Sequence, residues 1–333
     1  MKKKCLSFIG LVCFCSYVNN LRSQHIEEPI ATNVAEYCYF SPTAHYIALF
    51  KRIADFSTEG PYTYEMSIKN TKTNEITFKD TLIDAYADQS NVFWNNDDML
   101  FIAKKGVLEI RSKKYISVIL PNFLDIINYD ISANRCLYVT ADSRGTVLKS
   151  LQNGKELMVK ILQREQFEAE GIPSITINWD RSQKDSYVYE NNESTIDIIQ
   201  IDSKNNTRTK WRSIGFNPNY QYQLFITKTL MGLFSEEEKC LVIYNSMGKK
   251  ILDIKNVFSA CLEKDTIYFA SSVGLINVDT NGKETKVILK QDFTGYSIQK
   301  ITKEGYYFSI SEKQIWEGDS YQGEMLRIIV IRH

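Results

Sequence analysis

The segment YFSPTAHYIALF, residues 39–50, has the pattern of a short strand, a polar turn and a second strand rich in aromatic and β-branched residues. The same pattern recurs six times further along the chain, at 92–103, 129–140, 177–190, 216–227, 260–271 and 299–310. A unit repeated every 20–50 residues or so indicates a repeat architecture, in which each unit buries its apolar faces against its neighbours. These copies therefore decide the fold class before any single strand is assigned.

A second pattern alternates with the first. It is a hairpin whose strands meet at Asn, Asp or Ser and turn through Asn or Gly, residues that tolerate the positive φ of such turns. Clear copies occupy 66–79, 146–161, 196–211, 240–254 and 274–289, and weaker ones occupy 107–120 and 314–331. Together the two patterns give four short strands per unit and about 44 residues per unit, the size of a propeller blade. We therefore expect an all-β chain folded as a single β-propeller of about seven four-stranded blades, with six or eight blades as alternatives.

Residues 1–23 have the features of a secretory signal peptide. Lys2, Lys3 and Lys4 precede an apolar segment too short to span a bilayer, and cleavage after Ser23 would leave Gln24 as the first residue. The predicted organisation is a signal at 1–23 and a propeller domain at 24–333. Residues 24–34 either add a strand to the last blade or trail from it.

The charge of the mature chain excludes some classes of partner. The signal contains four of the 40 basic residues, which leaves 36 against 40 acidic residues, a net charge of −4. Such a chain has no basic excess to attract nucleic acid or anionic lipid. No apolar run after the signal reaches the roughly 18 residues of a membrane helix. We expect an exported protein of the periplasm or cell surface with no integral membrane span.

Four cysteines remain after the signal: Cys38, Cys136, Cys240 and Cys261. Their spacing matches no zinc pattern. In the expected ring no two of them lie on adjacent inner strands, so we predict no disulfide although an exported protein meets an oxidising compartment.

Catalytic signatures are scarce. Of the three histidines, His25 and His333 lie near the ends and His45 lies in a turn, so a Ser-His-Asp or Cys-His nucleophile system is not expected. No phosphate loop, dinucleotide fingerprint or calcium loop occurs, and we predict no cofactor and no metal. No catalytic residue is assigned.

Two groups of residues, five in all, are candidates for ligand binding at one rim of the ring. Trp94 with Asp97 and Asp98, and Trp179 with Asp180, stand beside the turns of two copies of the first pattern. Indole rings can stack on sugars or peptides, and carboxylates can bind polar groups. Turn chemistry for the aspartates and packing between blades for the tryptophans are the structural alternatives.

The segment FSPTAHYIALF and, more loosely, FNPNYQYQLF resemble the strand–turn–strand repeats of TolB-like propellers, and the QNGK and TNGK turns resemble the outer hairpins of the same blades. The resemblance is to the TolB-like and WD-repeat-like propeller superfamily. It implies an architecture and, beyond that, a protein- or ligand-binding ring in the cell envelope.

The function expected from the sequence is a non-catalytic propeller that binds a protein, peptide or glycan. One alternative is a carbohydrate-active hydrolase or lyase that uses acidic residues at the mouth of the central channel. The other is a structural subunit of an envelope assembly, which would expose a contiguous apolar patch.

Overall fold

The regular structure consists of strands alone in the part of the chain that the computed structural model describes. These residues are 27–54, 62–85, 87, 91–103, 105–118, 125–130, 135–143, 145–152, 155–163, 186–192, 195–202, 204–215, 217, 222–279, 282, 285–317 and 320–332. The expectation of an all-β fold is confirmed.

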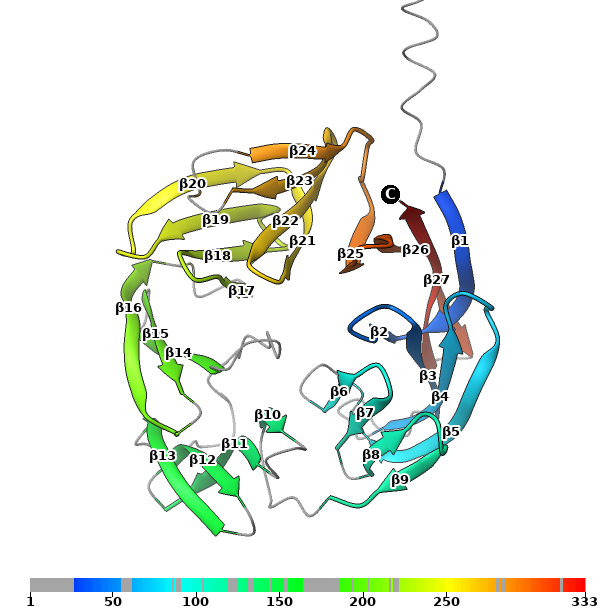
Figure 1. Cartoon of the computed structure of the whole chain (residues 1–333), viewed down its shortest axis with the longest axis horizontal. Helices are drawn as coiled ribbons and strands as arrows, with labels where there is room; N and C mark the ends of the chain where they lie inside the picture. Colours follow the sequence, from blue (N-terminus) through cyan, green and yellow to red (C-terminus); the bar gives the residue numbers. More distant parts are fainter. Residues whose placement is uncertain are drawn as a thin grey trace, which may run out of the picture.

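The described strands form seven separate antiparallel sheets, which follow one another around a ring (Figure 1). Six sheets have four strands, and the fourth along the chain has three within the described ranges. Sheet one comprises β2 (Tyr37–Phe40), β3 (Tyr46–Ala54), β4 (Tyr62–Asn70) and β5 (Ile76–Ala85). Sheet two comprises β6 (Val92–Asn96), β7 (Met99–Ile102), β8 (Gly106–Glu109) and β9 (Lys114–Ile116). Sheet three comprises β10 (Asp125–Asp130), β11 (Arg135–Asp142), β12 (Gly145–Gln152) and β13 (Lys155–Gln163).

The remaining sheets continue in the same order. Sheet four comprises β14 (Ser186–Asn192), β15 (Thr195–Ile201) and β16 (Thr207–Gly215). Sheet five comprises β17 (Gln223–Ile226), β18 (Leu230–Ser235), β19 (Cys240–Asn245) and β20 (Lys250–Lys255). Sheet six comprises β21 (Val257–Glu263), β22 (Thr266–Ser271), β23 (Gly274–Val278) and β24 (Thr285–Leu289). Sheet seven comprises β25 (Tyr296–Ile301), β26 (Gly305–Glu317), β27 (Ser320–Arg332) and, from the other end of the chain, β1 (Glu27–Ala35).

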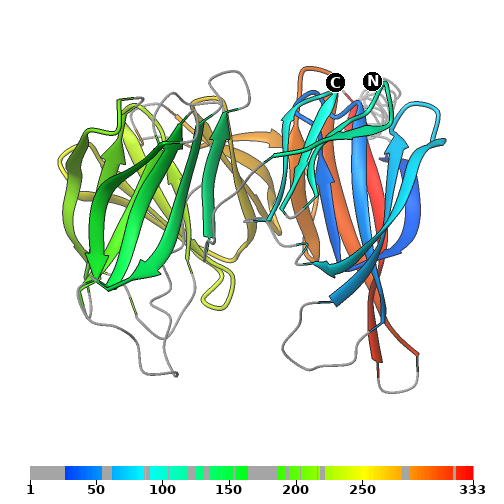
Figure 2. The ribbon, with the colours of Figure 1, turned by 90° about the horizontal axis from the view of Figure 1, so that it is seen from below.

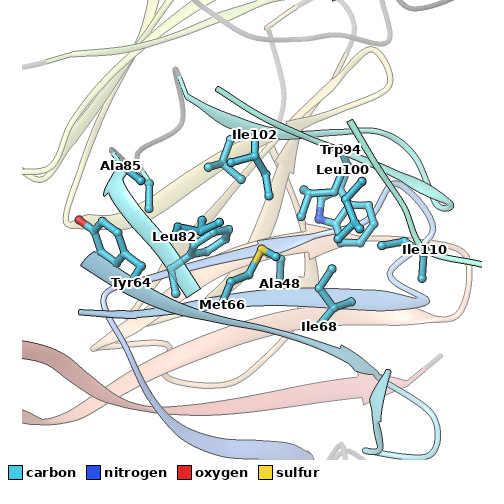
Figure 3. Close-up of a cluster of buried hydrophobic side chains, with 14 residues drawn as sticks. Ala48, Tyr64, Met66, Ile68, Leu82, Ala85, Trp94, Leu100, Ile102 and Ile110 are labelled. Atoms are coloured by element: carbon cyan, nitrogen blue, oxygen red, sulfur yellow. The ribbon is translucent and has the colours of Figure 1, made fainter. Parts of the chain in front are cut away.

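The buried core is divided among the contacts between successive sheets. Each of the seven buried clusters joins one sheet to the next, and the cluster that contains Ile30, Ile47 and Ile328 joins sheet seven back to sheet one. Figure 3 shows the cluster between sheets one and two, where Met66 and Ile68 of β4 meet Leu100 and Ile102 of β7. Because successive side chains of a strand point to opposite faces, one strand can serve two interfaces. The prediction of a single propeller is therefore confirmed.

The outer hairpins turn where the second pattern predicts. Asn74, Gly248 and Gly282 have positive φ between the third and fourth strands of their sheets, and Asn205 has positive φ between the last two described strands of sheet four. Asn245 supports one such turn, since its side-chain oxygen accepts hydrogen bonds from the backbone N–H groups of the residues two and four positions later, each at 3.0 Å. The Asn and Gly signals thus mark real turns.

The ring is closed by the first described strand. β1 pairs antiparallel with β27, from Glu27 opposite Ile331 to Ala35 opposite Glu324, and it becomes the outermost strand of sheet seven. Of the two expectations for residues 24–34, an added strand is therefore correct for the part described. The second pattern predicts an outer hairpin at 314–331. In the structure this hairpin is formed by β26 and β27, the second and third strands of sheet seven, and the fourth strand is β1 from the start of the chain.

The prediction of a strand–turn–strand unit at 216–227 is wrong. The first hairpin of sheet five is β17–β18, which turns at 227–229. The hydroxyl of Thr227 accepts a hydrogen bond from the N–H of Leu230 at 2.7 Å, so a threonine closes a turn that contains no Asn or Gly. All six residues of β18 are buried, with Met231 facing sheet four and Phe234 facing sheet six, so the strand has no polar alternation to reveal its position.

The four cysteines after residue 26 are free thiols. Cys38 and Cys261 lie on the first strands of sheets one and six, as expected, while Cys136 lies on β11 and Cys240 on β19. Burial raises the pKa of Cys38, Cys136 and Cys261 to about 12, which keeps these thiols protonated at neutral pH.

Candidate functional sites

Trp94 lies in the contact between sheets one and two. Its Nε1–H donates to the backbone oxygen of Tyr39 at 2.9 Å, and its ring stacks on Tyr46 with centroids 6.2 Å apart and planes 13° apart. The side chain is 7% exposed and points into the cluster of Figure 3. This placement corresponds to the packing alternative, and a stacking role for Trp94 in ligand binding stays a prediction.

Asp97 joins the turn of sheet two to the turn of sheet one. Its carboxylate accepts hydrogen bonds from the backbone N–H of Thr43 at 2.9 Å and from the Thr43 hydroxyl at 2.8 Å, and that hydroxyl also lies 2.8 Å from Nδ1 of His45. Burial acts to raise the pKa of Asp97, but hydrogen bonds from Ser41 and Thr43 and the nearby His45 outweigh it and hold the pKa below its ordinary value. The carboxylate is therefore charged and positioned by the fold.

Asp98 points to a different partner. Its carboxylate lies 2.8 Å from Nη2 of Arg111, and both side chains are solvent-exposed. The structure thus separates Asp97 and Asp98, which are adjacent in sequence, into two sets of contacts. Trp179 and Asp180 lie outside the described residues, so the predicted second half of this rim stays a prediction.

A projecting ribbon on sheet seven was not anticipated from the sequence. β25 pairs with β26 only as far as Ile310, and β1 pairs with β27 only as far as Glu324, which lies opposite Gln314, so residues 315–316 and 321–323 pair only with each other and extend beyond the sheet as a two-stranded ribbon. We call these residues the aromatic arm. Figure 2 shows the hairpin of β26 and β27 in red, extending past the neighbouring strands on one side of the ring.

The aromatic arm carries an exposed tryptophan. Trp316 is 57% exposed and lies beside Tyr321, with ring centroids 5.2 Å apart and planes at 58°. Burial raises the pKa of Tyr321, which keeps its hydroxyl neutral. The two rings form a small aromatic surface with one face open to solvent.

A buried ion pair lies at the base of the arm. Arg52 of β3 donates to both carboxylate oxygens of Glu36, at 2.9 Å from Nε and 2.5 Å from Nη2, and the two side chains are only 11% and 10% exposed. The guanidinium lies 3.7 Å from the ring centroid of Tyr62 and 5.5 Å from that of Tyr321. This bidentate, stacked arrangement connects the arm to sheet one. Only the aromatic residues themselves could have indicated the arm from sequence, because both halves belong to strands that look ordinary.

Comparisons with known proteins identify the architecture. No family model matches the chain, and no curated protein matches it in sequence. Similar solved structures include the acylaminoacyl peptidase of Pyrococcus horikoshii, with 14% identity and a TM-score of 0.50 over 88% of this chain and 51% of that one. The chain thus spans about half of the peptidase.

Two further structures align at lower scores. An oligogalacturonate lyase in complex with manganese has 10% identity and a TM-score of 0.49, and the alignment covers 93% of this chain and 98% of the lyase. The β-propeller domain of the trilobed protease of Pyrococcus furiosus has 14% identity and a TM-score of 0.47, covering 90% and 94%. At such identities the likeness concerns the fold alone. The chain is a β-propeller, and the architecture expected from its repeats is confirmed.

Within the described ranges, no three or more His, Cys, Asp or Glu side chains are grouped so that they could hold a metal ion. Over the same residues no helix is long and apolar enough to cross a membrane.

Proposed function

We propose that this chain is an exported, non-catalytic propeller that binds a partner protein of the cell envelope through the aromatic arm. We also propose that the three-stranded sheet four, β14–β16, is a blade like the six four-stranded sheets, which gives a ring of seven blades. The observation that carries the proposal is the exposure of Trp316 on a ribbon that extends beyond its sheet. Tryptophan, tyrosine and arginine are the residues that most often dominate the binding energy of protein interfaces. Here the ring of Trp316 contacts that of Tyr321, and the Tyr321 ring in turn lies beside the guanidinium of Arg52.

The contact is made by side chains rather than by addition of a strand. The edge of β26 beyond Ile310 has register shifts at 311–313 and 315–316, and it carries Lys313. Bulges and lysines of this kind protect an exposed edge from pairing with another strand. A partner is therefore expected to receive the indole of Trp316 in an apolar pocket.

A photo-crosslinking amino acid placed at position 316 tests the proposal in native cells. We expect a discrete crosslinked adduct in the envelope fraction, and a strong decrease in co-purification of the same partner by the variant Trp316→Ala. Met247, 83% exposed in the turn after β19, is the control position. Adducts of equal yield at 247 and 316, or none at 316, would contradict the proposal.

The same cells test the other expectations. N-terminal sequencing of the envelope form should give a start near Gln24, and recovery of the full chain from the cytosol alone would exclude export. A glycan array separates the remaining alternatives. Glycan binding lost on substitution of Asp97 or Asp98, and retained by Trp316→Ala, would favour the carbohydrate-active alternative over a protein partner.

A further inference from the structure

A polar cavity lies where the ring closes. It has a volume of about 220 Å³, much larger than a single water needs, and it lies between β1 of sheet seven and the face of β3, β4 and β5 in sheet one. Alternate residues of β4, namely Glu65, Ser67 and Lys69, line it. The intervening residues of β4 lie on the opposite face, in the cluster of Figure 3. One strand thus has an apolar face toward sheet two and a polar face toward the cavity.

The lining has an excess of positive charge. Lys51 and Lys79, which lie opposite Glu65 and Ser67 in the strand register, join Lys69 around the cavity. Glu65 is the single acid in the lining, and its Oε1 lies 3.8 Å from Nζ of Lys79. Three ammonium groups against one carboxylate leave an excess of two positive charges in a concave space.

Asn33 of β1 adds a buried donor that lacks an acceptor. Lys69 donates from Nζ to Oδ1 of Asn33 at 2.7 Å, and because an ammonium group can only donate, this contact fixes which end of the amide faces the lysine. The Nδ2 group at the other end is buried and has no hydrogen-bond partner in the described part of the chain. A buried N–H without an acceptor is costly, so the contact between β1 and sheet one at the wall of the cavity is polar and only partly satisfied.

The crowding of the lysines also favours the binding of an anion. Burial, followed by the charge of Lys79, lowers the pKa of Lys69. An anion between these ammonium groups would relieve their repulsion and restore the pKa of Lys69 toward its ordinary value.

We propose that this cavity binds a doubly charged oxyanion group of the phosphate or sulfate class, held by Lys51, Lys69 and Lys79. Two negative charges match the excess of two positive charges in the lining. Since Lys69 also donates to Asn33 of β1, the anion would lie beside the contact between the strand that closes the ring and the first sheet. The site is separate from the aromatic arm and does not depend on the function proposed for it.

Isothermal titration of the purified protein with inorganic phosphate, sulfate and glycerol 1-phosphate tests the proposal. All titrations are run at one ionic strength adjusted with sodium chloride, since general screening and general stabilisation by these salts would otherwise mimic binding. We expect saturable binding with one anion per chain. Binding of inorganic phosphate or sulfate would indicate a free anion as ligand, whereas binding of glycerol 1-phosphate alone would indicate a phosphate carried on a larger molecule.

Variants of opposite charge make the test specific. Lys69→Gln and Lys79→Gln should each lower the affinity for the anion about tenfold or more, because each removes one positive charge a few ångströms from it. Glu65→Gln should raise the affinity by a similar factor, because it removes one negative charge. Lys114→Gln, on the outermost strand of sheet two, is the matched control and should bind as the unaltered protein does. Absence of saturable binding to all three probes would overturn the proposal. Equal affinities for Glu65→Gln, Lys79→Gln and the unaltered protein would also overturn it, and Glu65→Gln keeps the test decisive even if a lysine variant misfolds.

Discussion

Replacing Glu36 by glutamine removes the charge that opposes the buried guanidinium of Arg52 while leaving the side chain almost the same size. Both hydrogen bonds of the pair end on this carboxylate, at 2.9 and 2.5 Å. Glu36 lies between β1 and β2, where sheet seven joins sheet one, so the pair contributes to the closure of the ring. The variant Glu36→Gln therefore tests the contribution of the pair at the junction of sheets seven and one.

The expected loss can be estimated from the burial of the pair. Removing one partner of a buried ion pair costs about 3–5 kcal/mol, because the remaining charge loses its compensation. We expect about 3 kcal/mol for Glu36→Gln, since the rings of Tyr62 and Tyr321 remain beside the guanidinium. Changing both residues, to glutamine at 36 and to methionine at 52, should cost clearly less than the sum of the two single changes.

Urea unfolding followed by tryptophan fluorescence measures these losses. The matched control is the variant Glu304→Gln, since the pair of Lys72 and Glu304 also joins sheet one to sheet seven but has side chains 51% and 46% exposed. That change should cost about 0.5 kcal/mol or less. A loss below about 1 kcal/mol for Glu36→Gln, or additive losses in the double variant, would refute the reasoning.

Three further changes test other contacts. Trp94→Phe removes the indole N–H that donates to the backbone oxygen of Tyr39 and part of the packed ring, and it should lower the free energy of unfolding by about 2 kcal/mol; an unchanged urea midpoint would contradict the packing role. The Asp97 pKa is lowered in the folded state, so its contribution to stability is fully present above its unfolded pKa of 3.8 and is lost as the pH falls through the lower folded value. The difference in urea midpoint between the unaltered protein and Asp97→Asn should therefore shrink as the pH falls below about 4, and a difference that grows on acidification would contradict this sign. A chain without residues 27–35 should lose its cooperative thermal transition in circular dichroism or aggregate, because β27 becomes an open edge, and a monomer with an unchanged transition would show that β1 is dispensable.

The repeats predicted the fold wherever a strand ends at a recognisable turn residue. Asn74 and Gly248 mark turns because only a few residue types accept positive φ, and such signals are visible in the sequence. Sheet five shows the limit of this reasoning. Its strand β18 is buried on both faces and its turn is closed by the side chain of Thr227, so neither alternation nor a turn residue marks its position.

The candidate sites were harder to predict, because they depend on contacts between distant parts of the chain. Trp94 could be named from its place in the repeat, but its stacking on Tyr46 decides how much of it is exposed. The aromatic arm and the closure cavity each combine sheet seven with sheet one. No local pattern in the sequence predicts these contacts between sheets seven and one, because β1 and β3 come together only when the ring closes.

The pairing of β1 with β27 also means that β1 cannot pair until nearly the whole chain has been made. Arg332 of β27 donates to Glu28 of β1 at 2.6 Å across 304 positions of sequence, so the ribosome makes nearly the whole chain before that contact can form. At about 5–20 residues per second, β1 waits roughly 15–60 s for its partner. Throughout that interval the first strand presents unpaired backbone groups that other chains could bind. Among the described strands, β1 thus waits longest for its partner, and it is the segment that a chaperone would have to cover until β27 is made.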